Sequence, residues 1–436
     1  MCFCCFRSST FPDSAGMHLP LLFVLLLFVG GSKSESSQCT ECNFLVDLLH
    51  ESWGDKTTKE CLGDLAVIVC DTFKIEDNFV CTYIISDFRD EVLWILDQII
   101  ITPNQICGLL IDDCGNPYDP LVATWLLPMP GNAPPFVPKT PVQSGKPTLR
   151  VLHLTDLHLD MYYTPGLEAD CDTPQCCRPQ DVPNEVNAEN AASGTTKGIK
   201  RPAGYWGSVG NCDAPYYLFT NMLDHIVATN GKLDYIIVTG DLMSHDVWNY
   251  NNVSHMAFIK NISDSLRSYF PGVPVLQIMG NHEGVPIDNI APHFAPRQWH
   301  MDWLYGSMLK SWRDGIPDDQ NTTMIYRGSY VNKLYPGMRV IALNNVYGDS
   351  NNFWLYVNQS DPDSTMSWLI EQLLDAEAAG DKVQIIAHIN GGNGESLEGW
   401  DINYYNVVNR FANTITAQFM GKFNYLEANN GRDFVI

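Results

Sequence analysis

Basic residues are scarce in this chain of 436 residues. Its 26 lysines and arginines face 50 aspartates and glutamates, so the formal net charge is -24 and the pI is near 4.6. Such a balance argues against nucleic acid as a partner, and it suits an acidic compartment in which protonation relieves the repulsion between carboxylates. Acidity that only maintains solubility explains the charge equally well. The charged fraction is also low, at 17%, and 11 tryptophans indicate a substantial core.

The sequence also has no apolar run long enough to cross a bilayer comfortably. Residues 19–29 are uninterrupted hydrophobics followed by Gly30-Gly31-Ser32, which is the form of a secretory signal peptide. We therefore expect residues 1–33 to be a signal peptide, and the protein to pass through an oxidising compartment and be secreted or lysosomal. Four sequons fit this route and are candidate glycosylation sites: Asn252, Asn261, Asn321 and Asn358.

Cysteines crowd the segment that follows, where apolar residues recur at the three-to-four spacing of helices. The seven positions are Cys39, Cys42, Cys61, Cys70, Cys81, Cys107 and Cys114. A short helical segment with so many cysteines in a secreted chain predicts a disulfide framework, because so few residues bury too little apolar surface. Spacing alone leaves the pairing open, and a zinc site at Cys39-x-x-Cys42 is the alternative.

Nine prolines between Pro117 and Pro147 predict an extended, semi-rigid connector. We therefore expect a small all-α domain at residues 37–118, a linker at 119–148 and a second domain at 149–436.

In the second domain, apolar strand patterns alternate with helical stretches. Strands are predicted at 151–154, 235–239, 275–279, 340–343 and 383–387, and helices at 216–229, 254–269 and 364–379. This alternation predicts a layered α/β domain, so the whole chain is expected to be an α+β multidomain protein.

Polar motifs follow four of these five strands. They are Asp156-Leu-His158, Gly240-Asp241, Gly280-Asn281-His282-Glu283 and His388. The carboxyl ends of strands in open α/β sheets usually bind the ligand, and a glycine before Asp241 and Asn281 lets the backbone turn sharply. Each motif alone is weak. Together they form the mixed Asp, His and Asn set that two divalent cations sharing a carboxylate require.

The order of these motifs resembles the calcineurin-like metallophosphoesterases, and other stretches are similar to the acid sphingomyelinase family within them. Those stretches are Asp170-Cys-Asp-x-Pro-x-Cys-Cys177, Gly204-Tyr-Trp-Gly207, His245-Asp-Val-Trp248, Asn352-Phe-Trp-Leu355, Gly380-Asp-Lys-Val383 and Asn403-Tyr-Tyr405. Six of the first seven cysteines resemble the pattern of a saposin domain, which the related nucleotide phosphodiesterases lack. The resemblance runs from about residue 39 to Phe419.

The resemblance implies a set of disulfides, in which Cys61 has no place. The pairs are Cys39–Cys114, Cys42–Cys107, Cys70–Cys81, Cys171–Cys176 and Cys177–Cys212. A saposin domain also implies a lipid or membrane-surface partner, although such a domain could instead only shield its neighbour.

Roles in the site are implied in the same way. Asp156 and His158 would hold one zinc ion, Asp241 would bridge two zinc ions, and Asn281 and His388 would hold the second. His282 and His245 would be catalytic residues that donate a proton to the leaving alkoxide or pair with the phosphate. For His245 a surface histidine is the alternative. The implied activity is hydrolysis of sphingomyelin to ceramide and phosphocholine by a dizinc site, and we expect a monomer.

The family pattern breaks at Gly421, where a further metal-binding Gly-His-x-His is expected. The sequence continues instead with Lys422-Phe-Asn and contains no histidine after His388. Each zinc ion would lose one imidazole, so we expect metal binding to be weakened by orders of magnitude and a C-terminally truncated chain to have little or no activity. A catalytically silent lipid-binding protein, and a phosphodiesterase for nucleotides or other headgroups, are the competing hypotheses.

Overall fold

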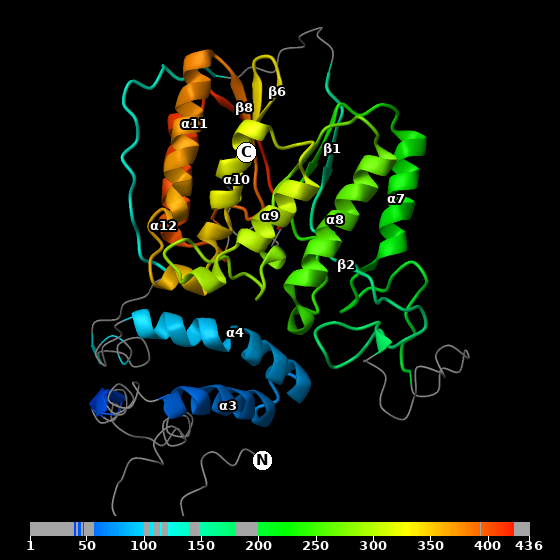
Figure 1. Cartoon of the computed structure of the whole chain (residues 1–436), viewed down its shortest axis with the longest axis vertical. Coiled ribbons are helices and arrows are strands. Elements are labelled where there is room, and N and C mark those ends of the chain that lie inside the picture. The colour runs from blue at the N-terminus through cyan, green and yellow to red at the C-terminus, as the bar shows by residue number, and fades with distance from the viewer. Residues whose placement is uncertain are drawn as a thin grey trace, which may run out of the picture. The chain divides into compact units, whose positions relative to one another are not determined.

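The computed structural model describes residues 56–99, 121–138, 148–179, 199–392 and 394–422, with ten further positions around the first and last cysteines of the N-terminal segment. The chain divides into two compact units, residues 1–123 and 124–436, which are coloured from blue to red in Figure 1. The division falls inside the predicted linker. The predicted signal peptide and linker residues 139–147 lie outside the described residues.

The first unit is helical where it is described. Helices α3 (Lys56–Thr72) and α4 (Asn78–Gln98) pack against each other, and the Cys70–Cys81 disulfide joins them across their turn. Two further disulfides, Cys39–Cys114 and Cys42–Cys107, tie distant segments together. These are the pairs that the resemblance implies, and they exclude a zinc site at Cys39 and Cys42. The side chain of Cys61 lies outside the described part.

The second unit contains two main sheets and a small parallel pair. Parallel strands β1 (Val151–Leu154), β4 (Tyr235–Val238) and β5 (Val275–Gln277) form the first sheet in the order β1-β4-β5. The second sheet runs β6 (Tyr330–Tyr335), β7 (Met338–Ala342), β8 (Lys382–Ile386) and β9 (Ile415–Phe419), and only the β6–β7 pair is antiparallel. The short strands β2 (Leu159–Asp160) and β3 (Ala214–Pro215) pair beside them.

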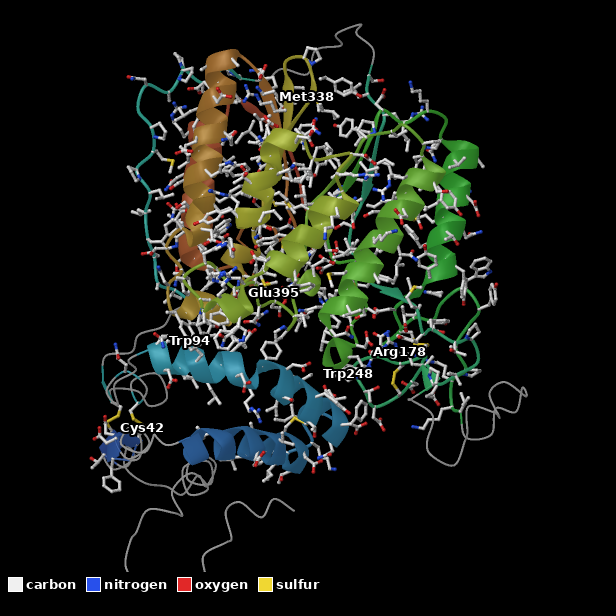
Figure 2. All side chains as sticks on the ribbon, viewed as in Figure 1. Cys42, Trp94, Arg178, Trp248, Met338 and Glu395 are labelled. Carbon is white, nitrogen blue, oxygen red and sulfur yellow. A yellow bond between two sulfur atoms is a disulfide. The ribbon has the colours of Figure 1, made fainter. Side chains whose placement is uncertain are left out.

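Helices cover the sheets. In Figure 1 the strands stand between α7 (Tyr216–Thr229) and α8 (Asn252–Tyr269) on one side and α11 (Thr365–Ala379) and α12 (Glu398–Arg410) on the other. Helices α9 (Asp302–Ser311) and α10 (Asn321–Arg327) lie between these pairs. One buried cluster holds side chains of both sheets, and Figure 2 shows how closely side chains fill the space between strands and helices. This large shared core confirms the predicted layered α/β fold.

Most predicted elements of this unit are present, with small changes of boundary. The sequence reading missed β6, because polar Asn332 and Lys333 interrupt its apolar pattern, and it missed α9, α10 and α12. Strand β5 is shorter than predicted and ends at Gln277, although Ile278 and Met279 are buried and the N–H of Ile278 still donates to Val238 at 2.9 Å.

None of the described helices is both long and apolar enough to cross a membrane.

Burial of His255 in α8 gives a test of this packing. The side chain is 2% exposed and lies against Tyr250, and burial lowers the pKa of His255 from 6.5 to about 4. Because the unfolded state takes up this proton first, the free energy of unfolding should fall as pH drops from 6.5 towards 4, by up to about 3 kcal/mol from this residue. Denaturant titrations over that pH range should show a flatter dependence for His255→Gln. The exposed His225→Gln is the control, and an unchanged pH dependence in His255→Gln would contradict the prediction.

Candidate metal centre

The five predicted ligands come together at the carboxyl edge of four strands. Asp156 and His158 follow β1, Asp241 follows β4, Asn281 follows β5 and His388 follows β8. The Nε2 atom of His388 lies 3.0 Å from Asp241 Oδ2 and 3.0 Å from Asn281 Oδ1. One ligand atom from each of Asp156, Asp241 and His388 lies within 4.8 Å of the other two. Parallel strands end at the same edge of a sheet, which is why residues so distant in sequence meet here.

Left-handed backbone conformations turn these side chains inward. The φ angles are 50° at Asp156, 37° at His158 and 55° at Asp241, values uncommon for residues other than glycine. Gly240, with φ 88°, is also in close contact with Gly280: a Cβ on Gly240 would lie 2.2 Å from the Gly280 nitrogen, and a Cβ on Gly280 would lie 2.1 Å from Asp241 Oδ1. The two glycines therefore allow the ends of β4 and β5 to approach closely, as the motifs predict.

Asp241 is the most buried acid of the centre, with 2% exposure. Burial alone would raise the pKa of Asp241, but the neighbouring His388 and His282 imidazoles hold it well below its usual range. Its Oδ1 accepts a hydrogen bond from the backbone N–H of His282 at 3.0 Å, and its Oδ2 lies 3.6 Å from His158 Nε2. Asp241 is thus an ionised carboxylate that contacts His388, His158 and the backbone of His282.

His388 is fully buried and fixed from several sides. Its Nδ1 lies 2.6 Å from the carbonyl oxygen of Thr239, and Asn345 Oδ1 accepts hydrogen bonds from the backbone N–H groups of His388 and Ile389 at 3.0 and 3.1 Å. Burial would lower the pKa of His388, but Asp241 raises it to about 9. Asn345 follows β7, the one predicted strand without a motif, and its role was missed.

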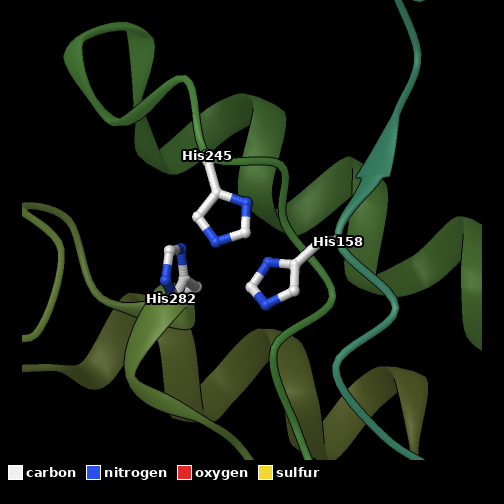
Figure 3. Close-up of side chains that lie close together, drawn as sticks. All are labelled: His158, His245 and His282. Carbon is white, nitrogen blue, oxygen red and sulfur yellow. The ribbon is translucent and has the colours of Figure 1, made fainter. Parts of the chain in front are cut away.

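A second group consists of three imidazoles (Figure 3). The rings of His158, His245 and His282 point toward one another, with centroids 4.0 Å apart for His158 and His245, 4.7 Å for His158 and His282, and 4.8 Å for His245 and His282. Their nitrogens also satisfy the distances of a possible metal group. His245 therefore belongs to the centre and is not an isolated surface histidine.

A partner on Nδ1 orients each of the three rings. Nδ1 of His158 lies 2.7 Å from the carbonyl oxygen of Met243, and Nδ1 of His282 lies 2.8 Å from the hydroxyl of Tyr250. Nδ1 of His245 lies 2.8 Å from Asp213 Oδ1. The ring nitrogen opposite each partner, Nε2, is left to face the site.

The pKa values of the three imidazoles shift in different directions. Burial lowers the pKa of His282 to about 3, and burial also lowers the pKa of His158. For His245, burial acts downward, but the hydrogen bond and charge of Asp213 raise the pKa above its ordinary value. The pKa is thus lowered for His158 and His282 and raised for His245, so His245 holds its proton to a higher pH than the other two imidazoles.

Arg178 connects the segments that carry two of these histidines. The side chain, labelled in Figure 2, is 1% exposed and donates to both oxygens of Asp160 at 2.8 Å, to Ser244 Oγ at 2.9 Å and to Asp246. Asp160 lies two residues after His158, and Asp246 directly follows His245. The sequence reading assigned no role to Arg178 or Asp213. Their positions beside the bridged Cys177 and Cys212 are the signal that could have found them.

The described chain returns to the centre at Gly421. A Cβ on this residue would lie 2.8 Å from Asp156 Oδ2 and 2.8 Å from His388 Nδ1, and the ammonium of Lys422 pairs with Glu395 at 2.7 Å. Residues 423–436 lie outside the described part. The expectation of weakened metal binding, which rests on the lack of a histidine after His388, stays a prediction.

Glu283 stabilises the turns that follow β4 and β5. Its buried carboxylate accepts backbone N–H groups from Gly280 at 2.6 Å, Leu242 at 2.8 Å and Asp241 at 3.1 Å. Glu283→Ala should lower the free energy of unfolding by at least about 2 kcal/mol, because three buried donors lose their acceptor. Thermal and denaturant unfolding measure this, with the exposed Glu398→Ala on α12 as the matched control. Equal stability of the two variants would show that Glu283 does not hold these loops.

Comparison with known proteins agrees with this geometry. Residues 149–411 match the model of the calcineurin-like phosphoesterase family. The chain is 39% identical over 402 residues to sphingomyelin phosphodiesterase 2 of Caenorhabditis elegans, which covers 90% of this chain and 65% of that protein. It is 33% identical over 389 residues to the human sphingomyelin phosphodiesterase, covering 88% of this chain and 58% of that protein. The chain thus spans less than two thirds of the length of these relatives.

Among solved structures, a dimetal phosphatase from Danio rerio aligns with a TM-score of 0.35 and 12% identity, over 63% of this chain and 81% of that one. The predicted site residues fall within residues 149–411, the segment that matches the family model. The chain belongs to the calcineurin-like phosphoesterases and is a relative of the sphingomyelin phosphodiesterases within them.

Proposed function

We propose that this protein is a metal-dependent phosphodiesterase that hydrolyses sphingomyelin to ceramide and phosphocholine. The observation that carries the proposal is the meeting of Asp156, Asp241, Asn281 and His388 at four strand ends. Its similarity to sphingomyelin phosphodiesterases along about nine tenths of its length supports the choice of substrate. The five disulfides suit a secreted or lysosomal protein, because such bridges persist in oxidising compartments.

The donor set fits two zinc ions. Carboxylate oxygens, imidazole nitrogens and an amide oxygen are ligands that zinc accepts, and the buried Asp241 carboxylate needs cationic partners in a site of low polarity. Asp156 and His158 would hold one ion and Asn281 and His388 the other, with Asp241 between them. When bound, the ions supply an activated water molecule and neutralise charge on the phosphoryl oxygens.

The remaining imidazoles would handle the leaving group and the phosphate. Attack of water on phosphorus forms one P–O bond and breaks the bond to the ceramide oxygen, which must take up a proton. His245 is the donor we assign, because Asp213 lies 2.8 Å from its Nδ1 and raises the pKa of its ring. His282 is held by Tyr250 and would donate or accept a hydrogen bond at the phosphoryl group as a neutral ring.

The first unit would present the lipid. Several apolar side chains on and between α3 and α4 are exposed: Ile68 (51%), Phe73 (54%), Ile75 (63%) and Tyr83 (55%). Exposed apolar surface of this kind marks contacts with lipid or other partners. This supports the membrane surface as the place where the enzyme meets sphingomyelin.

Removal of metal tests the proposal. The full chain, dialysed against a chelator and resupplied with zinc in excess, should regain weak sphingomyelin cleavage at pH 5, because no histidine after His388 completes the ligand set. Asp241→Asn should reduce this turnover on the order of a hundredfold or more. Asp319→Asn, an exposed acid in the turn before α10, is the control. Elemental analysis in saturating zinc should give about two zinc ions per chain. No bound zinc and no turnover would favour the silent lipid-binding protein, and faster cleavage of a nucleotide diester would favour the other phosphodiesterase hypothesis.

The contact between Asp213 and His245 predicts a shift in the pH profile. The Asp213 carboxylate raises the pKa of His245, so Asp213→Asn should lower that pKa and deprotonate the ring at lower pH. Because the proposed proton donor is then lost earlier as pH rises, the alkaline limb of the profile of kcat against pH should move to lower pH. His245→Gln should reduce kcat roughly 100-fold or more and remove that limb. An unmoved limb in Asp213→Asn would contradict proton donation by His245.

A further inference from the structure

An exposed patch of aromatic and apolar side chains lies on the loops around the small β2–β3 pair. Its members, which we call the aromatic patch, are Met161 (50% exposed), Tyr162 (66%), Tyr205 (61%), Trp206 (53%) and Val209 (91%). Side chains of this size and polarity seldom gather on a protein surface without a partner.

The aromatic rings pack on one another and enclose no gap. The centroids of Tyr205 and Trp206 lie 5.0 Å apart, those of Tyr205 and Tyr217 lie 4.9 Å apart, and those of Trp206 and Tyr217 lie 5.9 Å apart. The hydroxyl of Tyr217 donates to the carbonyl oxygen of Tyr205. The three rings therefore form one contiguous aromatic cluster.

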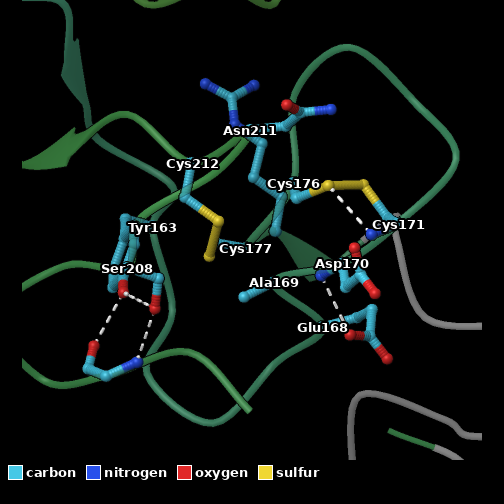
Figure 4. The surroundings of a disulfide bond; sticks show 12 residues. Tyr163, Glu168, Ala169, Asp170, Cys171, Cys176, Cys177, Ser208, Asn211 and Cys212 are labelled. Atoms are coloured by element: carbon cyan, nitrogen blue, oxygen red, sulfur yellow. Dashed lines mark hydrogen bonds between the residues drawn. A yellow bond between two sulfur atoms is a disulfide. The ribbon is translucent and has the colours of Figure 1, made fainter. Parts of the chain in front are cut away.

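Hydrogen bonds and a disulfide fix the backbone next to Tyr205 and Trp206, and Figure 4 shows these contacts. The hydroxyl of Tyr163 donates to the carbonyl oxygen of Gly204 at 2.7 Å, and Ser208 Oγ accepts from the Gly204 N–H at 2.9 Å. The Cys177–Cys212 disulfide lies in the small core beneath. The aromatic side chains are therefore held outward while the backbone that carries them is fixed.

The patch is close in sequence to residues of the metal centre. Met161 and Tyr162 follow His158 after the two residues of β2. On the other strand, Asp213, which binds His245, lies directly before β3, and Tyr217 is the second residue after β3, in α7. The same short pair of strands thus positions both the imidazoles and the aromatic rings.

The local charge differs from that of the whole chain. Residues 200–210 contain exposed Lys200 and Arg201 and no acidic residue, in a protein with a net charge of -24. Lys200 and Arg201 complement the phosphate groups of a lipid surface, although Glu168 accepts hydrogen bonds from their backbone N–H groups. Exposed tryptophan and tyrosine side chains are typical of a surface that enters the interface of a bilayer.

We propose that the aromatic patch is an interfacial anchor that seats this unit on the surface of a zwitterionic phospholipid bilayer, with the imidazole side of the metal centre at the membrane. Tryptophan and tyrosine favour the headgroup region because each combines an apolar ring with a polar tip. The inference deepens the proposed function and rests on it, since a lipid substrate has to be reached at a membrane.

Partition onto phosphatidylcholine vesicles tests the anchor. The full chain is sedimented with vesicles in the presence of a chelator, so that no turnover is required. The partition coefficient of the double variant Tyr205→Ser/Trp206→Ser should fall at least about tenfold, because two interfacial aromatic side chains are lost. Tyr205→Phe/Trp206→Phe should retain most of the binding.

Tyr405→Ser is the matched control, because Tyr405 is 64% exposed and lies on α12, outside the patch. A partition coefficient for the double variant equal to that of Tyr405→Ser overturns the proposal. So does a parallel loss of thermal stability in the double variant, which would assign the rings a structural role. Binding of tetramethylammonium that disappears in the double variant, with vesicle binding unchanged, would make the patch a small-cation site and also overturn it.

Hydrolysis of a soluble substrate distinguishes a failure of this inference from a failure of the proposed function. Hydrolysis of a soluble aryl phosphodiester with added zinc should be the same in the native chain and the double variant, because the patch contains no residue of the centre. The native chain could hydrolyse neither a soluble diester nor sphingomyelin and still bind vesicles through Tyr205 and Trp206. That result would contradict the proposed enzyme activity and support the anchor.

Discussion

The buried carboxylate of Asp241 is the interaction on which the rest of the second unit depends. An ionised acid with 2% exposure costs several kcal/mol of solvation unless charges and hydrogen bonds replace the lost water. Here the backbone N–H of His282 and the imidazole of His388 supply that replacement. Both come from other strand ends, so the folded arrangement of β4, β5 and β8 is a condition for an ionised Asp241 at this depth.

That condition explains two unusual features of the backbone. Gly240 and Gly280 leave no room for a Cβ between the ends of β4 and β5, and without this approach the N–H of His282 would not reach Asp241. Glu283 then collects the N–H groups that the sharp turns leave without partners in the ladder. Burial, and to a lesser extent the nearby Asp241, raises the pKa of Glu283 to about 7.

Sequence patterns predicted the fold and the residues that meet at the strand ends because both depend on local rules. Apolar runs marked the core strands, and a glycine marked the turns before Asp241 and Asn281, whereas no glycine precedes Asp156 or His158. Residues that act from a distance were not visible. Asn345, at the end of β7, accepts a hydrogen bond from the backbone N–H of His388. Arg178 binds Asp160 and Asp246, which are distant from it in sequence. Asn345 stands in no pattern that identifies such a role, and the position of Arg178 beside Cys177 is a signal without a stated partner, so tertiary contacts had to show both roles.

Burial changes from one side of the centre to the other, and this indicates the route of the substrate. His388 is fully buried and Asn281 is 2% exposed, whereas the side chain of His158 is 16% and that of His245 is 46% exposed. Among the described residues of the centre the imidazole side is thus the more exposed, and a phosphodiester that approaches from this side would meet the ring of His245 first. The loops on this side also carry the aromatic rings and the exposed Lys200 and Arg201. A lipid headgroup that enters here would keep its hydrocarbon chains beside the aromatic surface, so one short pair of strands would determine both the chemistry and the direction from which the membrane is approached.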